Sequence, residues 1–198
     1  MLFKTNNYEI ELSAKGEIKS LVFGGKQFVK TVLPLLEFRL RNGSDTKNLD
    51  SNKADDIKFL EDANQVRFSY SFNSPKVTFI AKLTFNDRIE ASFSYENNSD
   101  MYTEWVNFPQ IAVPNDLVRN GGSGRLVIDT NEGLLIEDLS AKEDFYPYKY
   151  KEMEYPSQGL YSMFPAVVQS QFLAYYDDSA GIYIAAEDTD RGIKGIDF

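Results

Sequence analysis

Residues 66–95, VRFSYSFNSPKVTFIAKLTFNDRIEASFSY, decide the fold, because they contain three segments in which apolar and polar side chains alternate. The apolar positions of the three segments are Val66, Phe68, Tyr70 and Phe72, then Val77, Phe79, Ala81, Leu83 and Phe85, and finally Ile89, Ala91, Phe93 and Tyr95. A period of two residues is typical of a β-strand, and residues 73–75 and 86–87 are turn sequences. The sequence therefore predicts an antiparallel meander of three strands, with one buried and one wet face.

A β-hairpin is predicted in residues 171–190, QFLAYYDDSAGIYIAAEDTD, where two apolar runs flank a short acidic turn. Side chains on both faces of each run are largely apolar. Strands of this kind lie between two layers, so we expect the hairpin to be buried on both sides. The turn residues Asp177 and Asp178 are expected to be solvated.

The rest of the chain shows turn signals about every ten residues and no amphipathic helix of a dozen residues, which predicts an all-β sandwich or barrel. Residues 42–56, NGSDTKNLDSNKADD, are polar and predict a long surface loop. The extended run 101–113 contains Pro109, which favours an edge strand or a bulge. Without a repeat or a linker, residues 1–198 are interpreted as one domain. The apparent strand at the end of the chain suggests the N-terminal part of a longer protein.

Composition excludes several kinds of chemistry. The chain has 198 residues, no cysteine and no histidine, so disulfides, thiolate chemistry and nucleophile systems that use histidine are excluded. A net charge of −9 disfavours nucleic acid and anionic lipid as partners. No signal peptide begins the chain, and no window approaches the roughly 18 apolar residues of a membrane span. We therefore expect a soluble, cytoplasmic protein that does not contact a membrane.

Two motifs approach known ligand-binding sequences but lack residues that those sites require. The acidic run from Asp50 to Asp56, with Glu61 beyond it, is close to EF-hand spacing. However, Ala54 stands where an oxygen ligand belongs, and Asp55 stands where the sharp turn needs glycine. The sequence GGSG at 121–124 lacks the Lys-Ser/Thr of a phosphate loop. No metal and no cofactor are therefore predicted.

Aromatic residues are the candidate binding residues. The segment 145–164 is rich in tyrosine, and a tyrosine or tryptophan ring can stack on a sugar or pack against protein. The candidates for carbohydrate binding are Trp105, Tyr146, Tyr148 and Tyr150. The alternative for Trp105 is a core anchor, and the alternative for the tyrosines is packing on this or a neighbouring domain. Single acids such as Glu104 or Asp188 are interpreted as solvated or strand-end residues.

Three stretches resemble the N-terminal β-sandwich of bacterial glycoside-hydrolase-like proteins, the galactose-mutarotase-like supersandwich. They are NYEIELSAKGEIKSLVFGGKQFV at 7–29, EWVNFPQI at 104–111 and, most specifically, YPSQGLYSMFPAVVQSQFLAYYDDSAGIYIAAEDTDRGIKGIDF at 155–198. The resemblance implies a large antiparallel β-sandwich that braces a downstream (β/α)₈ catalytic barrel of the same polypeptide. Aldose mutarotases of this type use a histidine, which this chain lacks, so no catalytic residue is carried over.

Three hypotheses follow. The first is a non-catalytic N-terminal sandwich of a glycoside hydrolase, which braces the catalytic domain and contributes to carbohydrate binding. The second is a stand-alone carbohydrate-binding module that uses exposed tyrosine or tryptophan. The third is a sugar-active enzyme with a carboxylate pair, which would need two acids about 5–5.5 Å or 6.5–9.5 Å apart.

Overall fold

The computed structural model describes residues 1–113, 124–130, 134–137, 161–164, 168–178, 180–187 and 194–197. The chain divides into two compact units, Met1–Pro114 and Asn115–Phe198. Every regular element of the described residues is a β-strand except one short 3₁₀ helix, so the predicted all-β class is confirmed. No helix in this part of the chain is long and apolar enough to cross a lipid bilayer.

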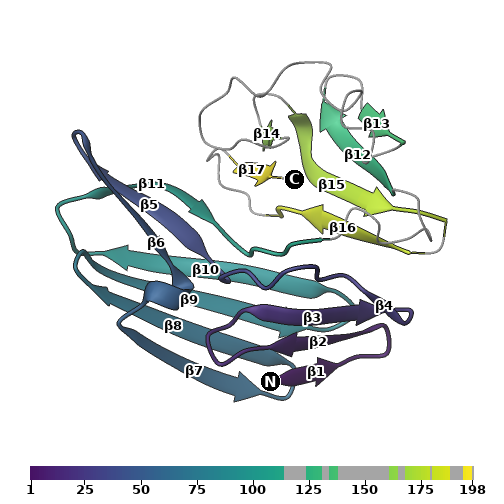
Figure 1. Ribbon diagram of the computed structural model, residues 1–198, viewed down its shortest axis with the longest axis horizontal. Helices are drawn as coiled ribbons and strands as arrows, with labels where there is room; N and C mark the ends of the chain where they lie inside the picture. Colours follow the sequence, from purple (N-terminus) through teal and green to yellow (C-terminus); the bar gives the residue numbers. More distant parts are fainter. Residues whose placement is uncertain are drawn as a thin grey trace. The chain divides into compact units, whose positions relative to one another are not determined.

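The first unit contains three antiparallel sheets (Figure 1). One sheet has the strand order β1-β2-β3-β4, formed by Leu2–Lys4, Tyr8–Leu12, Ile18–Phe23 and Lys26–Gln27. The second has the order β10-β9-β8-β7, formed by Ile89–Asn97, Lys76–Phe85, Gln65–Asn73 and Asp56–Asp62. The third has the order β11-β5-β6, formed by Tyr102–Asn107, Glu37–Asn42 and Asp45–Asp50, and the 3₁₀ helix η1 (Ser51–Lys53) follows it.

The core of the first unit lies between the β10-β9-β8-β7 sheet and the other two sheets. On β8 and β9 every second side chain is buried, as the alternation predicted. Aromatic contacts join the layers, with Phe3 of β1 stacked on Phe85 of β9 at 4.3 Å and Phe38 of β5 at 5.2 Å from Phe72 and 5.7 Å from Phe79. Because both layers place apolar faces against each other, this unit is a β-sandwich.

The predicted meander has the expected pairing. β8 pairs with β9 and β9 pairs with β10 over their full lengths, without a register shift. The prediction of a buried face is wrong for β10, where Phe93 and Tyr95 are 44% and 46% exposed. The reason is that β10 is the edge of its sheet, and the aromatic residues of the opposite layer contact β8 and β9.

Residues 42–56 do not form the predicted long loop. They contain β6, which pairs with β5 from Asn42–Asp45 to Glu37–Asp50, and then η1. Gly43 has φ of 60°, which a tight hairpin turn requires and which glycine adopts without strain. Because β6 is an edge strand with mostly exposed side chains, its sequence carries no apolar alternation.

The second unit contains the predicted hairpin. β15 (Val168–Tyr176) pairs with β16 (Gly181–Ala185) in a sheet of order β13-β12-β15-β16, with β12 at Arg125–Thr130 and β13 at Leu134–Ile136. A separate pair joins β14 (Tyr161–Phe164) to β17 (Lys194–Asp197). Leu173 and Tyr175 are buried, whereas Tyr183 is 66% exposed. The expectation that both faces are buried is therefore wrong at Tyr183, whose ring stacks on Phe172 at 5.5 Å.

At the turn, Asp178 is exposed, as expected, and forms an ion pair with Arg125 at 2.9 Å.

Candidate functional site

The outer face of the β11-β5-β6 sheet carries charged and aromatic side chains that contact one another. On β5, Phe38 and Leu40 point into the core and are buried. Since side chains alternate along a strand, Glu37, Arg39 and Arg41 lie on the opposite, outer face. We name this surface, with Arg39, Arg41, Tyr102, Glu104 and Trp105, the outer-sheet site.

A β-bulge places two aromatic residues on this face. Tyr102 pairs with Arg41 and Trp105 pairs with Arg39, and the register shifts between Thr103 and Trp105. In a regular strand, residues three apart point to opposite faces, but the extra residue of a bulge restores them to the same face. Tyr102 and Trp105 therefore lie on the arginine side of the sheet, with the bulge residue Glu104 between them.

Charged contacts hold the site together. Arg41 Nε donates to Glu104 Oε1 at 2.8 Å, and Arg39 Nε lies 3.9 Å from Glu104 Oε2. Arg39 also donates to Asn48 Oδ1 at 2.8 Å, and its guanidinium lies 5.2 Å from the centre of the Trp105 ring. Because the Glu104 side chain is only 17% exposed, these pairs are screened less than surface pairs and keep the side chains in place.

The site is amphipathic. Tyr102 is 57% exposed and offers a ring to solvent. Trp105 is half-buried, and its Nε1 is a buried donor with no hydrogen-bond partner among the described residues. A surface that combines aromatic rings with fixed charged groups can bind a ligand that has both an apolar face and hydroxyl or carboxyl groups.

The structure tests only part of the sequence-based site. Trp105 shares a face of the sheet with Arg39, opposite the buried Phe38 and Leu40, and it is half-buried rather than part of the buried core. Tyr146, Tyr148 and Tyr150 lie outside the described residues, as does Asp188. The interpretation of Glu104 as a solvated or strand-end residue is wrong, because it lies inside β11, is only 17% exposed and is placed by the bulge between two arginines.

Sequence reasoning missed Tyr102, Arg39 and Arg41. The alternation in LEFRLRN at 36–42 places both arginines on one face and was a usable signal. No comparable signal marks the bulge. It arises from the pairing of β11 with β5, which lies some sixty residues earlier in the chain.

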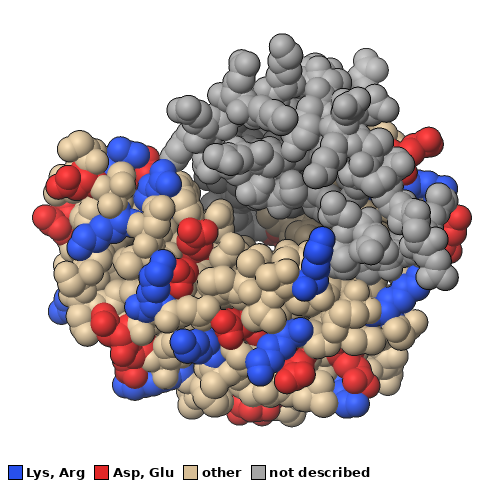
Figure 2. Space-filling model, viewed as in Figure 1, with Lys and Arg blue, Asp and Glu red and all other residues tan. Residues whose placement is uncertain are grey.

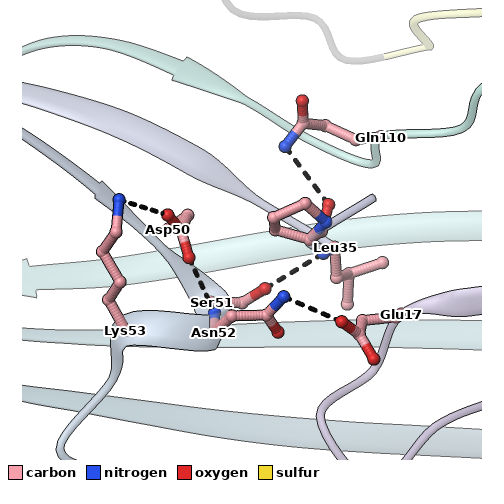
Figure 3. Close-up of polar contacts among 8 residues, drawn as sticks. Glu17, Leu35, Asp50, Ser51, Asn52, Lys53 and Gln110 are labelled. Carbon is pink, nitrogen blue, oxygen red and sulfur yellow. Dashed lines mark hydrogen bonds and ion pairs between the residues drawn. The ribbon is translucent and has the colours of Figure 1, made fainter. Parts of the chain in front are cut away.

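A second polar cluster lies around η1 and is drawn in Figure 3. Ser51 is fully buried, and its hydroxyl accepts a hydrogen bond from Leu35 N at 3.0 Å. Asn52 Nδ2 donates to Glu17 Oε1 at 2.8 Å, and Gln110 Nε2 donates to the Pro34 carbonyl at 3.2 Å. These bonds connect η1 with the segment before β5 and with the β2–β3 turn, which is a structural role.

The acidic run that approached EF-hand spacing contributes to this cluster. Asp50 caps η1 by accepting from Asn52 N at 3.0 Å, and it pairs with Lys53 Nζ at 2.7 Å. The hydrogen bond from Lys53 to Asp50 raises the pKa of the lysine above its usual value. The described residues contain no group of three acidic, histidine or cysteine side chains that could hold a metal ion.

The charged surface of the first unit is mixed. Figure 2 shows lysine and arginine side chains interspersed with aspartate and glutamate over the described residues of this face. Neither sign of charge gathers into a continuous stripe there.

Comparison of the chain with protein-family models, curated proteins and solved structures found no match. The resemblance to galactose-mutarotase-like sandwiches therefore rests on the three quoted stretches, and it stays a prediction.

Proposed function

We propose that the chain is a non-catalytic β-sandwich domain of a carbohydrate-active protein, and that its outer-sheet site binds a saccharide. The observation that carries the proposal is the bulge at Glu104, which brings Tyr102 and Trp105 onto the same face as Arg39 and Arg41. The surface lies on the central strand β5 and the edge strand β11 of one sheet, and side chains on strands are held more precisely than side chains on loops.

A sugar fits the chemistry of this face. One side of a pyranose ring is apolar and stacks on an aromatic ring, while its hydroxyl groups need donors and acceptors at the rim. The exposed ring of Tyr102 supplies the stacking surface, and the carboxylate of Glu104 with its two arginines supplies polar groups. Since one side of Trp105 already contacts Arg39, we assign Trp105 to the wall of the site and Tyr102 to its stacking surface.

The binding test compares Tyr102→Ala with Tyr95→Ala. Both tyrosines are about half exposed on neighbouring parts of the same unit, but only Tyr102 belongs to the outer-sheet site. A glycan array identifies a ligand for the 198-residue chain, and calorimetric titration measures its affinity. We expect Tyr102→Ala to weaken binding about tenfold or more, as for a lost stacking ring, and Tyr95→Ala to leave it unchanged.

Arg41→Lys keeps the charge but loses the Nε donor that holds Glu104 Oε1, so it should weaken binding as well. An array on which no glycan binds, or equal loss in both tyrosine variants, would contradict a saccharide site here.

The second half of the proposal concerns catalysis. The chain lacks the histidine and cysteine that most general-base and nucleophile systems need, and the resemblance implies a sandwich that braces a downstream (β/α)₈ barrel. We expect the 198-residue chain to show no turnover of nitrophenyl glycosides. Turnover that is lost when one acid is mutated would instead favour an enzyme with a carboxylate pair.

Reading the gene beyond Phe198 separates the two remaining hypotheses. An open frame of alternating strands and helices would support the bracing role, and a stop codon would support a stand-alone carbohydrate-binding module.

A further inference from the structure

Strand β10 is a long, regular edge. It is the terminal strand in the order β10-β9-β8-β7, and all residues from Ile89 to Asn97 pair with β9 without a bulge. Within the described residues, no strand pairs with its other side. An edge of this kind presents a row of backbone N–H and C=O groups that can accept another strand.

The opposite edge of the same sheet is protected, whereas β10 is not. On β7, the charged residue Glu61 pairs with the buried Val66 and so lies on the core side, while Lys58 and Asp62 lie on the outer side. Charges on both faces are a known defence of edge strands against pairing. On β10 the core side is apolar from Ile89 to Tyr95 and ends in the uncharged Asn97, and the charged residues are confined to the outer side.

The core side of β10 offers a surface for apolar side chains. Phe93 and Tyr95 are 44% and 46% exposed, and both rings stack on the buried Phe79, at 5.1 Å and 5.7 Å. Ala91, two residues before Phe93, is also exposed. An added strand would cover these side chains with its own alternate residues and extend the core by one strand.

The outer side of β10 selects the charge of the partner. Glu90 and Glu96 lie there, six residues apart, and their present partners Arg88 and Asn98 are exposed, at 3.0 Å each. Exposed contacts of this kind contribute little to stability, so the glutamates can exchange them for contacts with a partner. Antiparallel pairing of two copies centred on Phe93 would place Glu90 of one copy opposite Glu96 of the other. Like charges directly opposite are unfavourable, which disfavours the pairing of two copies in this register.

We propose that β10 receives an extended segment of a different, partner protein as an additional antiparallel strand. The segment carries lysine or arginine at two positions six residues apart, opposite Glu90 and Glu96. Apolar residues at the alternating positions between them cover Tyr95, Phe93 and Ala91. Backbone hydrogen bonds supply affinity, and the alternate side chains supply specificity. This inference does not rest on the saccharide site.

The first experiment uses a peptide, Lys-Val-Thr-Ile-Thr-Val-Lys with blocked ends, and the 198-residue chain. In the antiparallel register its lysines face Glu96 and Glu90, and its central isoleucine faces Phe93. Calorimetric titration should detect binding, and Phe93→Thr should weaken it about tenfold. The matched control is Phe59→Thr on β7, since Phe59 has the same 44% exposure, and this variant should bind like the parent chain.

Two further measurements separate strand addition from non-specific adhesion. The double variant Glu90→Lys, Glu96→Lys should lose the lysine peptide and bind the peptide with glutamate at both ends. N-methylation of alternate peptide residues should abolish binding in one frame only, because the N–H groups of that frame point towards β10. Circular dichroism checks that the variants stay folded, and both glutamates are exposed, so their replacement leaves the core intact.

Several outcomes would overturn the proposal. They are no binding of the lysine peptide, equal loss in Phe93→Thr and Phe59→Thr, and equal binding of both N-methylated frames. Concentration-dependent dimers in sedimentation that Phe93→Thr dissociates would also overturn it, because a second copy would then occupy the edge.

Discussion

Strands β9 and β10 are neighbours in one sheet and share the same alternation of apolar and polar side chains, yet their burial differs. On β9, the apolar residues from Val77 to Phe85 are buried. On β10, Phe93 and Tyr95 point to the same side but remain almost half exposed. Alternation therefore determines the face on which a side chain lies, whereas burial depends on how far the opposite layer extends.

The contacts across the sandwich explain where burial ends. Phe38 reaches Phe72 and Phe79, and the Tyr70 hydroxyl donates to the Lys15 carbonyl at 2.9 Å. On β10, Phe93 contacts Phe108 beyond β11, at 5.4 Å. β8 and β9 are thus held by the opposite layer, and β10 is held mainly by its pairing with β9. Three measurements test whether β10 is packed less tightly than β8 and β9.

The largest expected effect comes from shortening an aromatic side chain on each strand. Phe79→Ala removes a fully buried ring and should lower the free energy of unfolding by about 3–5 kcal/mol. Phe93→Ala removes a half-exposed ring and should cost about 1 kcal/mol. Urea denaturation of both variants measures the difference. Equal losses of unfolding free energy would show that β10 is packed as tightly as β9, which would contradict the difference in burial between the two strands.

A smaller effect is expected at Gly16, which lies beside the Tyr70 hydroxyl where the opposite layer meets β8. Gly16 has φ of 86°, and an added Cβ would clash with the Tyr70 hydroxyl oxygen. Gly16→Ala should therefore cost about 2 kcal/mol, from backbone strain together with the clash. Thermal unfolding checks this.

Tyr70→Phe removes the hydroxyl that clashes with the added Cβ of the Gly16→Ala variant. Tyr70→Phe should therefore lower the free energy of unfolding less in the Gly16→Ala variant than in the parent chain. Strictly additive losses would show that the contact does not matter.

The smallest expected effect is on stability at alkaline pH. Burial raises the pKa of Tyr70, and burial together with the charge of Asp87 raises the pKa of Tyr8 to about 12. Both pKa values are higher in the folded state than the usual value near 10. The stabilisation of the fold by the two neutral tyrosine side chains is therefore complete below about pH 10. It is lost as the pH rises through the folded pKa values.

We expect the free energy of unfolding to decline above about pH 10, and Tyr70→Phe to flatten that decline. The matched control is Tyr102→Phe, because Tyr102 is exposed and should leave the slope unchanged. Urea denaturation at a series of pH values compares the slopes, and identical slopes in all three proteins would contradict the role of the buried phenol.

Much of the strand pairing was predictable because it depends on local patterns. The alternation in residues 66–85 correctly placed Val66, Phe68 and Phe79 in the core, and the turn signals correctly separated the strands. The hairpin of β15 and β16 was predictable for the same reason. The edge strand β6 was not, since an exposed strand needs no apolar face and its sequence resembles a loop.

The candidate site was predictable only at Trp105. In a regular strand, Tyr102 and Trp105 point to opposite faces, so the sequence alone predicts that their rings lie on different sides of the sheet. The bulge at Glu104 reverses this outcome, and it exists because β11 must match the register of β5. The two arginines pair with Glu104 for the same reason.

The all-β class, the main strand pairs and the exclusion of cysteine and histidine chemistry follow from the sequence, because they depend on residue type and on a period of two. The covered apolar faces and the residues of the outer-sheet site become evident only in the folded chain. The physical reason is that coverage and register depend on contacts between strands far apart in the chain, where a single extra residue moves a side chain to the other face.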